Sequence, residues 1–158
     1  MKKLIEYLEK KEFIEEANSL RNGGTSLKLS EKNIGDVEIK EIIELLKKNT
    51  TLISLSFWGN KIGNAGAKEI AKLLKTNKTI TSLDLGYNNI TGAGTKELEQ
   101  ALKINVTLIS FNLAWNQIDT LIAKKVKGYL LRNLGIANIA KENDNKESCV
   151  MSFESIEV

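Results

Sequence analysis

Apolar residues recur along this chain at a fixed interval of 28 residues. The interval is clearest for pairs of apolar residues that are separated by one position: Leu27 and Leu29, Leu55 and Phe57, Leu83 and Leu85, and Phe111 and Leu113. Other columns keep the same phase: Ile34, Ile62, Ile90 and Ile118, and the asparagines Asn49, Asn77, Asn105 and Asn133. A fixed period of about 20–50 residues indicates a repeat architecture. The chain is therefore predicted to be a stack of similar units.

Each unit contains two kinds of hydrophobic spacing. Its first part alternates between apolar and other residues, as in the segment from Ser82 to Gly86, which is typical of a half-buried strand. Its second part has apolar residues at helical spacing, as in Ile70, Leu73 and Leu74. A helix is about 10–12 Å wide, whereas neighbouring strands lie about 4.8 Å apart, so the helical layer needs the longer path. We therefore expect an α/β fold, a short curved solenoid with a parallel β-sheet on its concave face and helices on its convex face.

Polar residues mark the ends of the predicted helices. Asp36 and Asn64 are expected to be N-caps, and Thr120 and Gly92 are acceptable at the same place. The asparagines of the column that begins at Asn49 are expected to adopt the left-handed conformation that follows many helices.

The phase of the repeat sets the expected domain boundaries. One repeat domain should cover residues 1–140, with repeats at 25–52, 53–80, 81–108 and 109–136. Residues 1–24 should cap its N-terminal end with a helix over residues 2–20, whose inward side chains would be Leu4, Leu8, Ile14 and Ala17. A fifth copy begins at Ile136 and Ile139 but fails at Lys141, so we expect residues 141–158 to be a mobile tail.

The pattern Leu83-x-Leu85-x-x-Asn88-x-Ile90, followed by a helix and an Asn-x-Thr-Leu ending at 105–108, resembles the ribonuclease-inhibitor type of leucine-rich repeat. Similar repeats occur in the sensor domains of NOD-like receptors and in Ran GTPase-activating proteins. The resemblance covers residues 25–136 and implies a cytosolic horseshoe that binds proteins. The first repeat departs from the pattern, because Lys32 occupies the position that an asparagine holds in the later repeats.

The asparagines at the strand ends are predicted to be structural. Asn60, Asn88 and Asn116 should point inward as a ladder and hydrogen bond to the backbone of their own and adjacent turns. Four Asn-x-Thr triplets, beginning at Asn49, Asn77, Asn89 and Asn105, match glycosylation acceptors as strings. Three of them recur in phase with the repeat, so we assign those asparagines to helix ends rather than to glycans.

Composition argues against catalysis. The chain has no histidine, which removes the commonest general base and metal ligand. Its single cysteine, Cys149, lies in the predicted tail without a histidine to activate it, and no glycine-rich phosphate loop occurs. We therefore expect no enzyme activity, no catalytic residue, no metal and no cofactor.

Charge and hydropathy limit the partners. The net charge of +3 is small, and the lysines of the helices are mixed with glutamates and lack interleaved aromatic residues, so we expect no nucleic-acid partner. No run approaches the roughly 18 apolar residues of a membrane span. We expect a cytoplasmic protein, with a monomer favoured.

The outward side of the sheet is the best candidate site. With Leu83 and Leu85 inward, Asp84 must point outward. Exposed aromatic residues on a rigid surface are enriched at binding hot spots. The predicted partner-binding residues are Ser56, Trp58, Asp84, Tyr87, Asn112 and Trp115. The alternative interpretation is that the aromatic residues only shield the strand ends and pack on one another.

We therefore predict an intracellular protein–protein interaction module that binds a partner protein on its concave face. One alternative is a regulator of a GTPase resembling a Ran GTPase-activating protein, although neither arginine, Arg21 nor Arg132, is placed on the predicted sheet. Another alternative is a fragment or paralogue of a larger repeat-containing receptor. The terminal segment 156–158 could also add as a strand to a PDZ domain.

Overall fold

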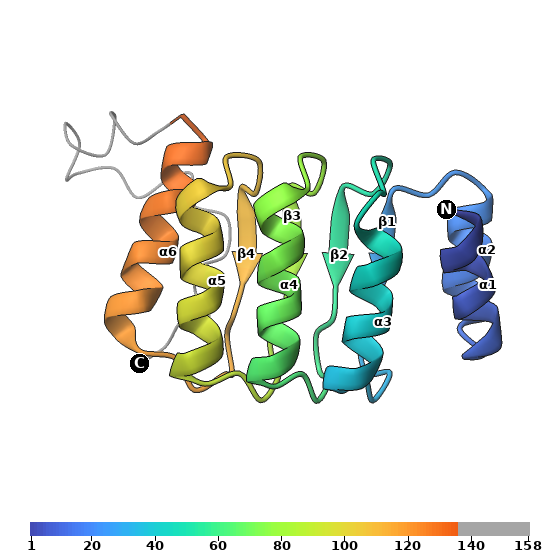
Figure 1. Cartoon of the computed structure of the whole chain (residues 1–158), viewed down its shortest axis with the longest axis horizontal. Helices are drawn as coiled ribbons and strands as arrows, with labels where there is room; N and C mark the ends of the chain where they lie inside the picture. The colour runs from blue at the N-terminus through green and yellow to red at the C-terminus, as the bar shows by residue number, and fades with distance from the viewer. Residues whose placement is uncertain (136–158) are drawn as a thin grey trace.

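The computed structural model describes residues 1–135 of the 158-residue chain (Figure 1). It begins with the helices α1 (Lys2–Lys10) and α2 (Ile14–Arg21). Strand–helix units follow: β1 (Ser26–Lys28) with α3 (Asp36–Leu46), β2 (Ser54–Ser56) with α4 (Asn64–Thr76), β3 (Ser82–Asp84) with α5 (Gly92–Ile104), and β4 (Ser110–Asn112) with α6 (Thr120–Asn133). The predictions for a fifth copy, for the tail 141–158 with Cys149 and for the segment 156–158 lie outside the described residues.

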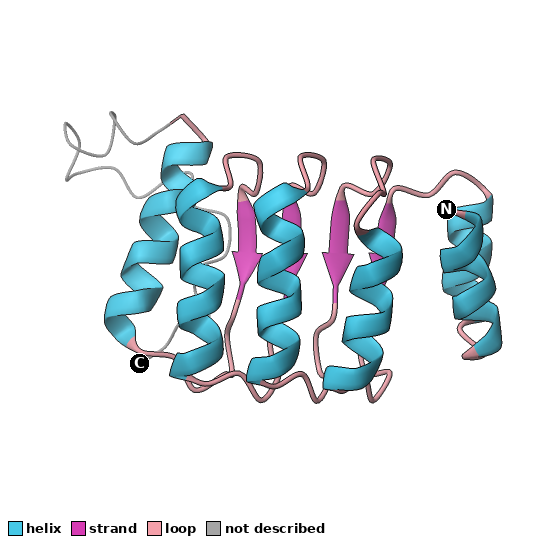
Figure 2. Cartoon of the chain, viewed as in Figure 1, coloured by secondary structure: helices cyan, strands magenta, loops and turns pink. Residues whose placement is uncertain are grey.

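The strands form one parallel sheet in the order β1-β2-β3-β4. Equivalent residues of adjacent repeats are paired, as Leu55 is with Leu83 and Leu83 is with Phe111. Helices α3, α4, α5 and α6 lie in one layer on one side of this sheet (Figure 2). The predicted α/β repeat solenoid is therefore confirmed.

The hydrophobic core lies between the sheet and the helical layer. The inward strand positions are all buried: Leu27, Leu29, Leu55, Phe57, Leu83, Leu85, Phe111 and Leu113. Helix positions such as Ile42, Leu74 and Leu102 pack against them and are also buried. Burying each such side chain stabilises the fold by about 1.5–3 kcal/mol. Because one strand and one helix cannot bury these side chains alone, each unit depends on its neighbours.

Glycines allow the central helices to approach closely. A Cβ atom added at Gly66 would lie 2.7 Å from Cγ2 of Ile39 on α3, and one added at Gly94 would lie 3.0 Å from Cβ of Ala67 on α4. The equivalent residue of α6 is Ile122, which carries a large side chain where α4 and α5 have glycine. Figure 1 accordingly shows α6 tilted relative to α3, α4 and α5.

The predicted N-caps were wrong by one residue. The observed N-caps of α3, α4, α5 and α6 are Gly35, Gly63, Thr91 and Asp119. Asp36 is instead the first residue of its own helix, and its Oδ1 accepts hydrogen bonds from the backbone N–H groups of Gly63 at 2.7 Å and Gly66 at 2.9 Å. Asn64 caps α5 in the same way. Two repeats therefore cap the helix of the following repeat, which also fixes the distance between helices.

The N-terminal cap is two helices, not the single helix predicted over residues 2–20. The chain turns between them at Glu12, which has a φ of 61°. The turn rotates the second helix, so Ile14 is 51% exposed and Leu20 is buried in place of the predicted Ile14. Leu4, Leu8 and Ala17 are buried as expected. The hydrophobic spacing of each segment could be predicted from the sequence, but the rotation of α2 relative to α1 could not.

Lys32 fastens this cap to the first repeat. Its Nζ lies 2.9 Å from Oε1 of Glu16 and 5.2 Å from the centre of the Phe13 ring, both of which come from the cap. The position that carries an asparagine in later repeats thus contacts the cap in the first repeat.

Candidate partner-binding surface

A column of asparagines fixes the turns that leave the strands: Asn60, Asn88 and Asn116. Nδ2 of Asn88 donates to the carbonyl oxygens of Leu85 in its own repeat and Phe57 in the preceding repeat, both at 3.0 Å. Its Oδ1 accepts from the backbone N–H of Ile62 at 3.0 Å. Asn88 is buried, so these bonds are formed away from bulk water. The column holds adjacent turns at a fixed separation.

A second asparagine column lies at the opposite end of the strands, and the sequence interpretation missed its role. Asn77 has φ −71° and ψ 136°, which is extended and not the predicted left-handed conformation. Its Oδ1 accepts from the N–H groups of Thr79 and Ile80, both at 2.9 Å, and its Nδ2 donates to the carbonyl oxygen of Asn49 at 3.1 Å. Asn105 accepts in the same way from Thr107 and Leu108, and its Nδ2 donates to the carbonyl oxygen of Leu74 at 2.8 Å. The in-phase Asn-x-Thr triplets were the signal of this column.

The outward row of the sheet lies between these two columns. It consists of the third residue of each strand: Lys28, Ser56, Asp84 and Asn112. Oδ1 of Asp84 accepts from the N–H of Gly86 at 2.9 Å and from Nδ2 of Asn112 at 3.0 Å. Oγ of Ser56 lies 3.0 Å from Oγ of Ser30. These polar groups are therefore held in place by the protein itself.

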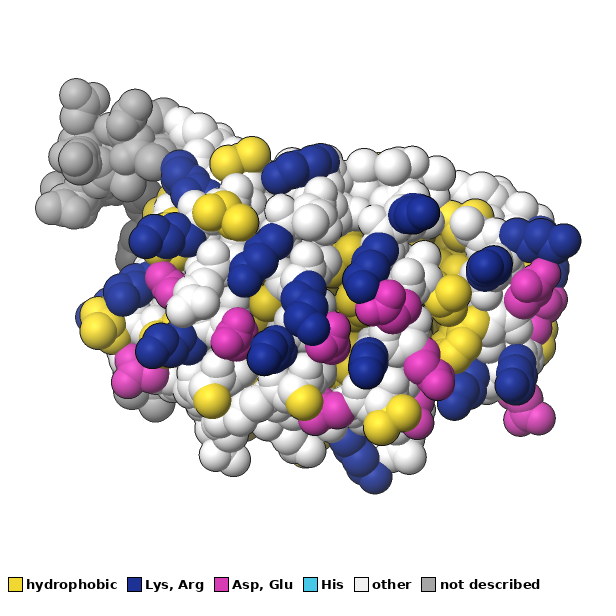
Figure 3. Space-filling view, viewed as in Figure 1, with side chains coloured by type: hydrophobic (Ala, Val, Ile, Leu, Met, Phe, Trp, Pro, Cys, Tyr) yellow, Lys and Arg dark blue, Asp and Glu magenta, His cyan; other side chains and the backbone are white. Residues whose placement is uncertain are grey.

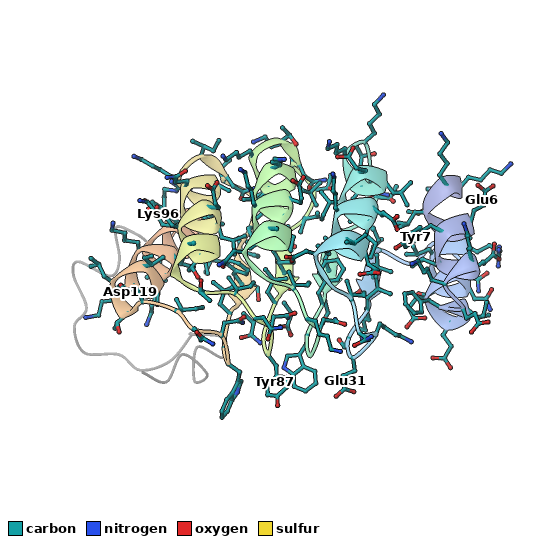
Figure 4. All side chains as sticks on the ribbon, turned by 60° about the horizontal axis from the view of Figure 1, so that its bottom comes forward. Glu6, Tyr7, Glu31, Tyr87, Lys96 and Asp119 are labelled. Atoms are coloured by element: carbon teal, nitrogen blue, oxygen red, sulfur yellow. The ribbon has the colours of Figure 1, made fainter. Side chains whose placement is uncertain are left out.

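Three aromatic side chains lie beside the outward row, and we call them the aromatic cluster: Trp58, Tyr87 and Trp115. The rings of Trp58 and Tyr87 stack with their centres 5.7 Å apart and their planes at 27°. Tyr87 is 59% exposed and Trp115 is 73% exposed. Figure 4 shows Tyr87 projecting away from the helical layer, whereas Lys96 lies on that layer.

Two members of the aromatic cluster occupy a backbone conformation that favours glycine. Tyr87 has a φ of 53° and Trp115 a φ of 58°, whereas Gly59 stands at the equivalent position of the second repeat with a φ of 67°. A left-handed conformation costs a residue with a Cβ atom about 1–2 kcal/mol. The fold therefore tolerates the two exposed aromatic residues at positions where glycine would be less strained.

Gly86 provides the space in which Trp58 lies. A Cβ atom added at Gly86 would be only 2.8 Å from Cδ1 of Trp58 and 2.8 Å from Nδ2 of Asn112. The indole therefore lies across the next strand and reaches the Tyr87 ring. This contact orders the Trp58 side chain.

The two sides of the solenoid differ in charge. Lysines and arginines, interspersed with acidic residues, cover the helical side (Figure 3). In contrast, the only charged residue between Thr79 and Thr95 is Asp84, and the only one between Ile104 and Ala123 is Asp119. The strands β3 and β4 and the turns that carry Tyr87 and Trp115 thus contain no basic residue.

The shifted pKa values belong to groups outside the aromatic cluster. Backbone N–H groups at the start of α3 lower the pKa of Glu38, and the Lys72 ammonium lowers the pKa of Glu69. The pKa of Tyr129 is raised because its hydroxyl donates to Oε1 of Glu99 at 2.9 Å. These groups stabilise helices rather than forming an acid–base pair.

The two arginines have structural partners. The guanidinium of Arg132 donates to the carbonyl oxygens of Leu102 and Lys103, both at 3.0 Å, at the C-terminal end of α5. That of Arg21 contacts Asn18 and Glu9 in the N-terminal cap. Neither side chain comes from the sheet.

Other features of the described chain do not form a second site. Within residues 1–135 no group of three or more acidic or sulfur side chains is arranged to hold a metal ion. No helix in the same range is long and apolar enough to cross a membrane. An open hollow of about 340 Å³ lies between α2 and β1, and it is lined by Glu15, Glu16, Ser19, Ser26 and Lys28.

Known proteins resemble this chain in sequence and in fold. A family profile described as Leucine Rich repeat matches residues 48–71 and 76–98. A Rickettsia felis protein that carries the name of an ankyrin repeat protein is 47% identical over 60 residues, which are 38% of this chain and 25% of that protein. The chain thus matches about a quarter of that relative's length.

Two solved structures align with most of this chain. The "Leiomodin-1 Actin-Binding Site 2 (ABS2)" structure has a TM-score of 0.61 and 23% identity, and the match covers 84% of this chain and 95% of that one. A tropomodulin C-terminal domain from Caenorhabditis elegans has a TM-score of 0.48 and 14% identity, with 80% and 96% covered. The repeat register, the parallel sheet, the family profile and the leiomodin-1 likeness together show that this chain has the fold of a leucine-rich-repeat solenoid.

Proposed function

We propose that this protein is an intracellular, non-enzymatic interaction module that binds a partner protein on the sheet side of its solenoid. The aromatic cluster carries the proposal. Tyr87 and Trp115 are large, exposed and apolar, and they lie on a surface whose polar neighbours are already positioned. Aromatic side chains in such a setting supply much of the energy of protein interfaces.

The rigidity of the surface supports the same proposal. Both asparagine columns fix the ends of the strands, and Trp58 is already stacked on Tyr87. Binding therefore requires little additional ordering of the chain, which reduces the entropic cost of association. Asp84, Asn112 and Ser56 would select among partners through their remaining hydrogen-bonding capacity. The leiomodin-1 structure carries the name of an actin-binding site. From this name we take only that a protein with a similar fold binds another protein.

The GTPase-regulator alternative lacks a supporting residue in the described structure. Its usual chemical device, an arginine that stabilises transition-state charge, would need a guanidinium directed at the partner. The Arg132 guanidinium instead bonds to backbone carbonyl oxygens of α5. The receptor-fragment alternative draws on the match to one quarter of a longer relative. It is compatible with the same binding surface.

A capture experiment tests the proposal. An aromatic variant should carry Trp58→Ala with Tyr87→Gly and Trp115→Gly, because glycine suits the left-handed backbone at the last two positions. The variant should fold with nearly unchanged stability and lose most of the proteins that the parent captures from a lysate. Truncation of a single hot-spot residue already costs about 2 kcal/mol or more of binding.

The matched control reverses charge on the helical side. Lys68→Glu with Lys96→Glu changes equivalent exposed positions of α4 and α5. We prefer Lys68 to Lys72, because Lys72 pairs with Glu69 at 2.6 Å and its reversal would disturb the helix. The control should capture what the parent captures. Retention of all partners by the aromatic variant, together with their loss from the lysine variant, would move the interface to the helical side.

A further inference from the structure

The chemistry around the aromatic cluster indicates which kind of partner side chain fits it. A carboxylate lies beside the aromatic rings. A Cβ atom added at Gly86 would lie 3.2 Å from Oδ1 of Asp84 and 2.8 Å from Cδ1 of Trp58. Asp84 and Trp58 therefore border one small area, and Tyr87 stacks on the far part of the indole. An acidic group and stacked aromatic faces together make a surface that attracts cations.

The hydrogen bonds of Asp84 leave part of its carboxylate available. Oδ1 accepts from the Gly86 N–H and from Nδ2 of Asn112. Within residues 1–135 no hydrogen bond or ion pair to Oδ2 is formed, and the residue is only half-buried. The two donors are neutral, so no cation among residues 1–135 compensates the charge of Asp84. The bonds to Oδ1 also fix the direction in which Oδ2 faces.

The surrounding charge favours a cation over an anion. No lysine or arginine occurs between Thr79 and Thr95 or between Ile104 and Ala123, the segments that carry β3, β4 and their turns. The nearest acidic residue in the second segment is Asp119, at the start of α6. Lysines are present on the helical side (Figure 3), and in the strands and turns of the first two repeats they occur as Lys28, Lys32 and Lys61. An acidic partner segment would meet favourable charge there and unfavourable charge at Asp84.

Resting on the function proposed above, we propose that the partner presents an arginine or lysine side chain to the aromatic cluster. The planar guanidinium or the ammonium group lies against the exposed faces of Trp58 and Tyr87 and pairs with Oδ2 of Asp84. The apolar stem of the same side chain, together with a neighbouring apolar residue of the partner, covers Trp115. Arginine suits the site better than lysine, because its planar group stacks on aromatic rings while it donates at its edge.

A display experiment with short random peptides tests this inference even while the partner is unidentified. Peptides are selected on the parent chain and counter-selected on the aromatic variant. The selected peptides should be enriched in arginine or lysine next to an apolar residue. Both tryptophans of the chain belong to the aromatic cluster, so intrinsic fluorescence reports the binding of each synthetic peptide directly.

Matched substitutions on both sides then isolate the charge. Asp84→Asn keeps an oxygen that can accept from the Gly86 N–H, removes the charge and replaces the accepting Oδ2 by an amide nitrogen that donates. Replacing the selected arginine by citrulline removes the charge of the peptide while preserving its shape. Each change alone should weaken binding about three- to tenfold, and the second change should add little after the first, because both remove one interaction. Binding to the parent should also weaken with added salt.

The outcomes separate this inference from the proposed function. Selected peptides that are acidic or purely apolar, bind the aromatic cluster and tolerate Asp84→Asn would overturn the cationic partner but retain the binding surface. Failure to recover any peptide that binds the parent but not the aromatic variant would overturn both. Self-association of the parent that is abolished in the aromatic variant, seen by analytical ultracentrifugation, would assign the surface to a second copy of this chain and also refute the inference.

Discussion

Removal of one ladder asparagine measures how strongly the repeats depend on their turns. Asn88→Ala deletes the acceptor of the buried Ile62 N–H and the donor to the carbonyl oxygens of Leu85 and Phe57, all at 3.0 Å. The side chain of alanine can replace none of these bonds. Each contributes about 0.5–1.5 kcal/mol, and a buried N–H left without an acceptor costs about 1–3 kcal/mol. We expect the free energy of unfolding to fall by about 2–4 kcal/mol.

Urea titration followed by circular dichroism gives this free energy, and the neighbouring Asn89→Ala is the control. Asn89 is exposed and its side chain forms no hydrogen bond within the described residues, so the change should stay within about 0.5 kcal/mol. Asn116→Ala should cost less than Asn88→Ala, because Asn116 is only partly buried and water can replace its bonds. Equal costs for Asn88→Ala and Asn89→Ala would show that the ladder does not hold the turns together.

Two further predictions concern helix packing and pH. Gly94→Ala should destabilise the protein by about 1–3 kcal/mol in the same titration, because the added Cβ would lie 2.6 Å from Oδ1 of Asn64. The control is Gly128→Ala on α6, whose Cβ would meet no atom within 4 Å and which should stabilise the protein by about 0.5–1 kcal/mol. Equal effects of the two substitutions would refute the close approach of α4 and α5. Since the folded pKa of Glu38 lies below its ordinary value of 4.5, its contribution to stability is present above that pH and is lost as the pH falls through the folded pKa. Glu38→Gln should therefore reduce the loss of stability measured by thermal melts on acidification below about pH 4.5, and an unchanged acid limb would contradict the assignment.

The repeat and its topology could be predicted from the sequence, because each copy meets the same physical requirements. Inward strand positions such as Leu55 and Leu83 must be apolar in every repeat, so their period of 28 residues indicated the sheet and its register. Strand alternation likewise indicated that Asp84 and Trp58 would face outward. Sequence periodicity is informative here because stacking repeats one environment many times.

Contacts between repeats were harder to predict from the sequence. Asp36 has the composition of an N-cap, but whether it caps its own helix or the next one depends on the distance between α3 and α4. That distance is set by Gly66, which a propensity argument treats only as a weak helix former. The extended conformation of Asn77 was missed for a related reason, since its amide serves the preceding repeat as well as its own turn.

The variation among otherwise equivalent positions bears on where function lies. The inward column and the two asparagine columns preserve their chemistry from repeat to repeat, because the same backbone groups and the same core must be satisfied each time. The outward row changes from Lys28 to Ser56 to Asp84 without any matching change in the fold. The left-handed column changes from Glu31 to Gly59, Tyr87 and Trp115, although glycine avoids the backbone strain that the other three residues incur. Folding alone therefore does not account for aromatic side chains at these positions, whereas the proposed partner interface would.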